Sequence, residues 1–198
     1  MKIIVISTPQ FLEHEAEYIH ALLDNGADRV HLRKPGSDIE DFEKLVETIR
    51  PEYYSRLTVT DHFETAGKFG LGIHTNSRNS RIPEGFQGLK SASCHSLDEI
   101  RSRKARYDYL FLSPIFDSIS KQGYRSAFSE EDLGKAREEG LIDSGVIALG
   151  GINPGNFSQL QEWGFGGGAL MGAVWGKDCR PESVETVIEN LRSFLKIT

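Results

Sequence analysis

The chain has 198 residues and a formal net charge of −6, with 38% hydrophobic and 26% charged residues. This composition is ordinary for a globular protein, and the acidic balance argues against nucleic acid as the main partner. No apolar run approaches the ~20 residues that a membrane span needs, and the short run at the N-terminus is too brief for a signal peptide. Cys94 and Cys179 lie in no metal-binding spacing, so we expect reduced thiols and a cytoplasmic setting without membrane partners.

Strand-like and helix-like segments alternate from the N-terminus onward. Short apolar runs predict strands, and longer runs with apolar residues three and four apart predict helices. The expected order in the first half is strand 2–6, helix 11–25, strand 29–33, helix 38–50, strand 57–60, a brief helix from His62, and strand 71–74. Residues 75–88 lack a helical period, so we expect the fourth helix of the alternation to be degenerate.

The second half continues the alternation. Its expected elements are strand 89–93, helix 96–104, strand 108–112, helix 129–139, strand 146–149, a helix starting at Asn153 and Pro154, strand 166–171, and helix 181–195. Ser96 is the expected N-cap of its helix, with Glu99 at the capping-box position. Eight parallel strands are the number that closes a (β/α)8 TIM barrel, so we predict one such α/β domain over residues 1–198. A doubly wound open sheet is the alternative.

Polar and glycine residues gather where the expected strands end. In a barrel the carboxyl ends of all strands meet at one face, and active sites lie there. The residues at these ends are Ser7, Thr8, His31, Arg33, Thr60, Asp61, His62, His74, Asn76, Ser93, His95, Ser113, Gly150, Gly151 and Gly172. We therefore expect the site among them.

The stretch GVIALGGINPGN, residues 145–156, stops a buried strand at two glycines. A backbone without Cβ atoms can bend sharply and lets a ligand reach its N–H groups. Barrels often bind phosphate between the loops after strands seven and eight, and here those loops carry Gly150, Gly151 and Gly172. We predict one phosphate cradle from these glycines, with a tight turn that binds no ligand as the alternative.

A family resemblance runs along the whole chain in a fixed order of segments. They are VHLRK at 30–34, TVTDHFETA at 58–66, GIHTN at 72–76, SASCHSLDE at 91–99, YDYLFLSPIFDSISK at 107–121, VIALGGIN at 146–153 and GGALMGAV at 167–174. Together they resemble thiamine phosphate synthase and the TenI-type thiazole tautomerases, which share a (β/α)8 barrel. The synthase joins hydroxymethylpyrimidine diphosphate to a thiazole phosphate and releases diphosphate. The tautomerase moves a proton within a carboxylated thiazole phosphate.

The resemblance implies a role for each matching residue. Arg33 matches the arginine that holds the diphosphate, a task that suits its planar fork of donors. Asp61 matches a carboxylate that binds Mg²⁺, and Lys121 belongs to a loop segment whose hydroxyls and lysine contact substrate. The predicted substrate-binding residues are His31, Thr60, Ser93, Ser118, Ser120, Gly150, Gly151, Met171 and Gly172.

Three positions depart from the synthase pattern. Pro35 stands where the family has a lysine, and Lys34 beside it should point to the other face of a continued strand. Asn79 stands where a second Mg²⁺ carboxylate is expected, and an amide is a weaker ligand for a hard cation. Thr60 replaces the asparagine that precedes Asp61 in the family. The alternative role for Asp61 is that of a helix N-cap without a metal. These changes weaken the case for magnesium–diphosphate chemistry.

His95 is the residue that we expect to transfer protons. Its ordinary pKa of ~6.5 lets it accept and donate near neutral pH, and it matches the histidine that acts in TenI-type tautomerases. We therefore predict a thiazole tautomerase that needs no cofactor, with His95, Lys121 and Arg33 as catalytic residues. Thiamine phosphate synthase with Mg²⁺ on Asp61 is the alternative. In both cases the ligands are small molecules, and a homo-oligomer stays open.

Two lesser alternatives come from the same strand ends. His31, His74, His95 and Asp61 at one mouth could hold zinc or iron, as in metal-dependent sugar-phosphate epimerases. The sequence patterns of those epimerases are absent, however. A non-catalytic, ligand-sensing barrel is the other alternative, and the presence of His95 and Lys121 counts against it.

Overall fold

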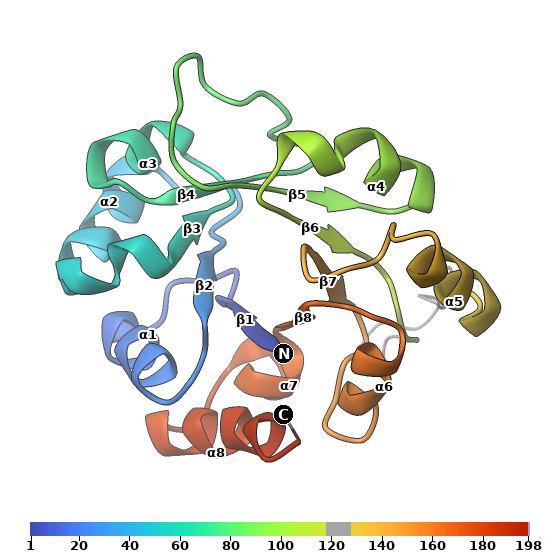
Figure 1. Ribbon diagram of the computed structural model, residues 1–198. Helices are drawn as coiled ribbons and strands as arrows, with labels where there is room; N and C mark the ends of the chain where they lie inside the picture. The colour runs from blue at the N-terminus through green and yellow to red at the C-terminus, as the bar shows by residue number, and fades with distance from the viewer. Residues whose placement is uncertain (118–127, 198) are drawn as a thin grey trace.

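The computed structural model is a closed barrel of eight parallel strands surrounded by helices (Figure 1). The structure describes residues 1–117 and 128–197. Each strand pairs in parallel with the next one along the chain, and β8 closes the barrel against β1, with Ile4 opposite Ala169. The predicted (β/α)8 class is confirmed.

The strands are short and almost fully buried, as expected where helices cover a parallel sheet. They are β1 Lys2–Ile6, β2 Arg29–Leu32, β3 Leu57–Val59, β4 Gly72–Thr75, β5 Lys90–Cys94, β6 Tyr109–Leu112, β7 Val146–Leu149 and β8 Gly167–Leu170. The predicted bounds of β1 and β7 are confirmed. The other strands differ from prediction by one residue at one or both ends.

The helices follow the predicted order with one addition. They are α1 Glu15–Asp24, α2 Ile39–Thr48, α3 Phe63–Phe69, α4 Leu97–Arg103, α5 Glu130–Glu138, α6 Phe157–Glu162, α7 Gly172–Trp175 and α8 Val184–Leu195. The four-residue helix α7 and three short 3₁₀ helices, Pro51–Arg56, Lys104–Arg106 and Lys177–Cys179, are too brief to show a period in the sequence. Ser96 caps α4 by accepting from the N–H of Glu99, as predicted.

Helices α1, α6 and α8 begin three or four residues later than predicted. Helix α8 begins at Val184 instead of residue 181, with Ser183 as its N-cap. Helix α1 begins at Glu15 instead of residue 11, because Glu15 accepts the N–H of Leu12 (3.1 Å) and holds the preceding residues as a loop. Helix α6 follows Asn156 as its N-cap, and the predicted cap at Asn153 is wrong. The side chain of Asn153 accepts from the N–H of Gly155 (2.8 Å) and forms a turn of its own.

The prediction that the helix between β4 and β5 is degenerate is confirmed. Residues 76–89, all of which the structure describes, form a long loop without a helix (Figure 1). This loop begins at the carboxyl end of β4, so its first residues lie at the mouth of the barrel. Side chains of this loop can therefore lie at the site, whereas a helix starting here would lead the chain away from the mouth.

The apolar core has two parts. The larger part fills the space between strands and helices and includes Cys94, which is fully buried as a packing residue. The smaller part fills the barrel interior and comprises Ile4, Ile6, Tyr109, Phe111, Ile147 and Ala169. Within residues 1–117 and 128–197, no helix combines the length and apolar character needed to cross a membrane.

Candidate active site

The ends of β2, β3 and β4 bring a connected set of polar residues to the mouth. The N–H of Thr60 donates to the carbonyl of Leu32 (3.1 Å), so the chain after β3 stays beside the chain after β2. Asp61 is 8% exposed, and its two carboxylate oxygens accept from the Thr60 hydroxyl (2.8 Å) and the Asn79 amide (3.0 Å). We call Arg33, Thr60, Asp61, Asn76, Arg78 and Asn79 the Asp61 edge.

Asp61 does not cap the following helix. His62 is the N-cap of α3 and makes no side-chain cap bond, while both oxygens of Asp61 face Thr60 and Asn79. Asn79 therefore lies directly beside Asp61, where the family resemblance led us to look for a second carboxylate. The Asp61 edge thus carries one carboxylate and one amide.

Arg33 lies half-buried at the same edge. Its N–H donates to the Ser7 hydroxyl (2.9 Å), which fixes the backbone where β2 ends. Burial lowers the pKa of Arg33 and the positive charge of Arg78 lowers it further, whereas Asp61 raises it. An arginine remains a cation despite such shifts. Arg33 can therefore offer a permanent positive charge to an anion at the mouth.

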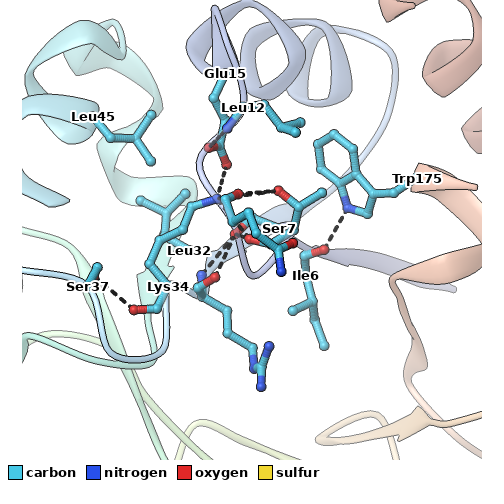
Figure 2. A network of polar contacts seen from close by, with 12 residues as sticks. Ile6, Ser7, Leu12, Glu15, Leu32, Lys34, Ser37, Leu45 and Trp175 are labelled. Carbon is cyan, nitrogen blue, oxygen red and sulfur yellow. Dashed lines mark hydrogen bonds and ion pairs between the residues drawn. The ribbon is translucent and has the colours of Figure 1, made fainter. Parts of the chain in front are cut away.

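Lys34 faces away from the mouth and is fully buried, in agreement with its predicted direction. Figure 2 shows its side chain directed at Glu15, which it pairs with at 2.7 Å. The same ammonium donates to the carbonyls of Thr8 (2.8 Å) and Gln10 (2.6 Å). Burial lowers the pKa of Lys34, and the charge of Glu15 opposes that effect. Lys34 therefore cannot replace the lysine that Pro35 removes.

His31 lies in the barrel interior below the mouth. Its Nε2 is 2.6 Å from the Tyr109 hydroxyl, and its ring stacks on Phe111 with centroids 4.8 Å apart. Burial holds the pKa of His31 well below its ordinary value, so its ring is neutral. We did not predict Tyr109 as its partner. The alternation in YDYLFL was the available signal, because it puts Tyr109 and Phe111 on one face of β6.

His74 and Ser93 form a second interior group. The Nδ1 and Nε2 atoms of His74 each lie 2.8 Å from a hydroxyl, of Ser91 and Ser93 respectively. Burial lowers the pKa of His74 to about 3, so this ring is also neutral at physiological pH. Both nitrogens of His74 are thus engaged by serines, and the hydroxyl of Ser93 is shared with this histidine.

His95 lies exposed on the rim of the mouth. Its Nδ1 is 3.1 Å from the carbonyl oxygen of Ser113, and its backbone N–H donates to Glu99 (2.9 Å). The Ser113 hydroxyl lies 3.3 Å from the same Nδ1. A carbonyl only accepts, so in the tautomer that bonds to it Nδ1 carries the proton and the neutral ring keeps Nε2 as an acceptor. His95 is therefore oriented so that Nε2 can take a proton from a ligand.

The histidines and Asp61 do not form a metal centre. Across the part of the chain that the structure describes, no three His, Cys, Asp or Glu residues are grouped to hold a metal ion. His31 and His74 lie in the interior with ring centroids 5.0 Å apart, while His95 bonds to Ser113 on the rim. The epimerase-type metal site proposed from the sequence is therefore not formed by these residues.

The glycine turn after β7 has a structural cause that the sequence did not reveal. Gly150 and Gly151 adopt positive φ values of 100° and 65°. A Cβ on Gly151 would lie 2.5 Å from the carbonyl oxygen of Asp117, so this turn packs tightly on the chain after β6. After the neighbouring strand β8, Met171 is half-buried and Gly172 has open space where a Cβ would lie. The phosphate cradle itself stays a prediction.

Three predicted site residues belong to the segment 118–127. Ser118, Ser120 and Lys121 lie outside the described residues.

Comparison with known proteins identifies the family. A family model described as thiamine monophosphate synthase matches residues 3–174. The chain belongs to this family. The thiamine-phosphate synthase of Methanococcus maripaludis is 27% identical, with 99% of this chain and 97% of that protein covered. The crystal structure of a thiamine phosphate pyrophosphorylase from Bacteroides thetaiotaomicron is similar with a TM-score of 0.90 and 38% identity, covering 100% of this chain and 97% of that one.

A more distant structure agrees in fold. The thiamine phosphate pyrophosphorylase from Pyrococcus furiosus has a TM-score of 0.74 and 23% identity, covering 98% of this chain and 96% of that chain. The family resemblance deduced from the sequence is confirmed. Membership of the thiamine monophosphate synthase family does not by itself distinguish the synthase from the tautomerase reaction.

Proposed function

We propose that this protein is a thiamine phosphate synthase, which joins hydroxymethylpyrimidine diphosphate to thiazole phosphate and releases diphosphate. The observation that carries the proposal is the Asp61 edge, where a guanidinium, a carboxylate and an amide meet. The names of the similar proteins support it too. Our sequence-based preference for the tautomerase rested on the losses at Pro35 and Asn79. The grouping of Arg33, Asp61 and Asn79 favours the synthase.

The arrangement of the mouth suits two phosphorylated substrates. In the closed strand order, β7 and β8 lie across the barrel from β3 and β4. The Asp61 edge would take the diphosphate, and the loops with Gly150, Gly151 and Gly172 would take the thiazole phosphate. A joining reaction needs two anion sites on opposite sides of the reacting atoms, whereas a tautomerase needs one.

The residues of the Asp61 edge fit a magnesium ion that a substrate helps to bind. Mg²⁺ prefers oxygen ligands and is commonly held by one or two carboxylates together with substrate phosphates. Asp61 supplies the carboxylate, and Asn79 can supply its amide oxygen if its side chain turns. When bound, the ion would neutralise charge on the diphosphate. One carboxylate is therefore compatible with the reaction if the diphosphate provides the remaining oxygens.

Arg33 has a defined task in this scheme. The carbon–oxygen bond to the diphosphate breaks, and the thiazole nitrogen forms the new bond to that carbon. Negative charge grows on the departing diphosphate, and a fixed cation beside it stabilises the transition state more than the ground state. The Ser7 hydroxyl, by accepting the N–H of Arg33, keeps the start of this side chain in place.

A thiazole tautomerase is the second candidate, and His95 is the observation in its favour. Its Nε2 is left as an acceptor on the rim by the contact of Nδ1 with Ser113. Such a histidine could remove a proton from one carbon of a thiazole and return it elsewhere. This reaction requires neither Asp61 nor a metal ion.

A paired turnover assay distinguishes the two reactions. One arm supplies hydroxymethylpyrimidine diphosphate, thiazole phosphate and Mg²⁺ and is analysed for thiamine phosphate. The other supplies the carboxylated thiazole phosphate without metal and is analysed for the aromatic tautomer, with His95→Ala alongside. We expect thiamine phosphate in the first arm, lost on chelation of the metal. Turnover only in the second arm, abolished by His95→Ala, would replace the synthase with the tautomerase.

A further inference from the structure

The loop after β4 is bound to the end of β3 by an asparagine. The Asn76 side chain donates to the carbonyl of Thr60 (3.1 Å) and accepts from the backbone N–H groups of Arg78 (2.9 Å) and Asn79 (3.1 Å). The amide of Asn79 then donates to Thr60 and Asp61. Arg78 therefore extends from a backbone position that is fixed next to Asp61.

Arg78 and Arg33 approach this edge from two different strand ends. Arg33 follows β2 and Arg78 lies in the loop after β4, with the end of β3 between them. Burial is the largest cause that lowers the pKa of Arg33, and the positive charge of Arg78 is the second. The two guanidinium groups therefore influence each other. Like charges repel, and an anion between them removes that repulsion.

Several arginines of the chain are held by the protein itself. Arg29, Arg56 and Arg103 donate to backbone carbonyls. Arg50 and Arg101 pair with carboxylates. Five further arginines, Arg33, Arg78, Arg81, Arg106 and Arg180, have guanidinium groups that form no hydrogen bond or ion pair with any residue in the described ranges 1–117 and 128–197. Of these five, only Arg33 and Arg78 belong to the Asp61 edge. Two such groups at one mouth leave ten N–H donors for a ligand.

We propose that Arg78 is a second diphosphate-binding residue, which holds the leaving diphosphate together with Arg33 across the Asp61 edge. The proposal rests on the proposed synthase function. A diphosphate has two phosphoryl groups, and each can accept two parallel N–H bonds from one guanidinium. Arg78 thereby supplies, from the loop after β4, the positive charge that Pro35 removes from the chain after β2. A single-phosphate ligand would need only one of these arginines.

Binding of inorganic diphosphate tests the proposal directly. Calorimetry with Mg²⁺ present compares the unmodified protein with Arg78→Ala, Arg78→Lys and the control Arg81→Ala, an exposed arginine of the same loop. We expect Arg78→Ala to weaken binding about 10- to 100-fold, Arg78→Lys to recover part of it, and Arg81→Ala to match the unmodified protein. In turnover, Arg78→Ala should raise KM for the pyrimidine diphosphate and leave KM for thiazole phosphate unchanged.

The outcomes separate the two proposals. If the protein makes thiamine phosphate and Arg78→Ala binds diphosphate as tightly as the unmodified protein, the role of Arg78 is wrong while the synthase stands. If diphosphate binds and Arg78→Ala weakens it, but no thiamine phosphate forms, the anion site stands and the synthase is wrong. If the unmodified protein neither binds diphosphate nor makes thiamine phosphate, both are wrong.

Discussion

Arg33 and Lys34 are neighbours in the chain, yet they lie in opposite environments. Lys34 is fully buried and pairs with Glu15 at 2.7 Å, with two backbone carbonyls completing its hydrogen bonds. Arg33 is half-buried at the mouth, beside Asp61 and Arg78. The ammonium of Lys34 is enclosed and paired by the protein, whereas the guanidinium of Arg33 is accessible to a ligand.

The difference shows how the two charges contribute. A buried charge is expensive unless it is paired and hydrogen-bonded, so Lys34 belongs to the stability of the fold. An open cation contributes little to folding and is available to a ligand. We group Lys34 and Glu15 with the buried His74 as the closed set, and compare them with the Asp61 edge.

Removing Lys34 should have the largest effect on stability. In Lys34→Met, Glu15 stays buried without its partner, which we expect to lower the free energy of unfolding by about 3–5 kcal/mol in urea titrations. Adding Glu15→Leu should restore most of the loss. The exposed pair Lys44–Asp41 is the control, and Lys44→Met should cost less than about 1 kcal/mol. Equal losses of unfolding free energy in Lys34→Met and Lys44→Met would contradict the distinction between buried, paired charges and exposed ones.

Removing Arg33 should act on catalysis and leave the fold intact. We expect Arg33→Ala to lower kcat/KM for thiamine phosphate formation by about 10²–10³-fold, because the departing diphosphate loses a fixed cation. The free energy of unfolding should change by less than about 1 kcal/mol. A stability loss as large as that of Lys34→Met, with activity retained per folded molecule, would place Arg33 in the closed set.

His74 should make the protein less stable in mild acid. Its pKa is about 3 when folded, against about 6.5 in an unfolded chain, so the unfolded state binds a proton in this range and the folded state does not. The contribution of His74 is complete above pH 6.5 and declines as the pH falls, by about 2 kcal/mol at pH 5. Urea titrations at pH 7 and 5 should show a smaller decline for His74→Gln. The exposed His14→Asn should leave the decline unchanged; an unchanged decline in His74→Gln contradicts the assignment.

Asn79→Asp tests whether the Asp61 edge binds a metal ion, and we expect it to have the smallest effect of the four predictions. Asn79 donates to Asp61 at 3.0 Å, and a second carboxylate there would repel the first. We expect a loss of about 1–2 kcal/mol in the free energy of unfolding without metal. Mg²⁺ should reverse the loss and raise Tm more than it does for the unmodified protein. No difference in the Mg²⁺ response would argue against a metal at this edge.

The barrel could be predicted because its elements carry local signals. Buried parallel strands are short apolar runs, and β7, Val146–Leu149, was predicted at its observed bounds. Ser96 was recognisable as a cap because a serine precedes a helical period. Helix α1 was predicted too long, because its start depends on Glu15 and on Lys34, which is distant in sequence.

The candidate site was predictable only in part. The rule that active sites lie at strand ends selected Arg33 and Asp61. It could not select Arg78, because an exposed arginine in a loop looks ordinary until Asn76 is seen to fix the backbone beside Asp61. Likewise, the glycines after β7 suggested a ligand site in the sequence. The structure shows a further reason for glycine at position 151, which is the close approach of the Asp117 carbonyl.

The most direct measurement is a crystal structure of the protein with Mg²⁺ and inorganic diphosphate. The account predicts diphosphate at the Asp61 edge, between the guanidinium groups of Arg33 and Arg78, with the metal ion on the carboxylate of Asp61. Diphosphate seated on the loops of Gly150 and Gly172, with Asp61 free of metal, would contradict it.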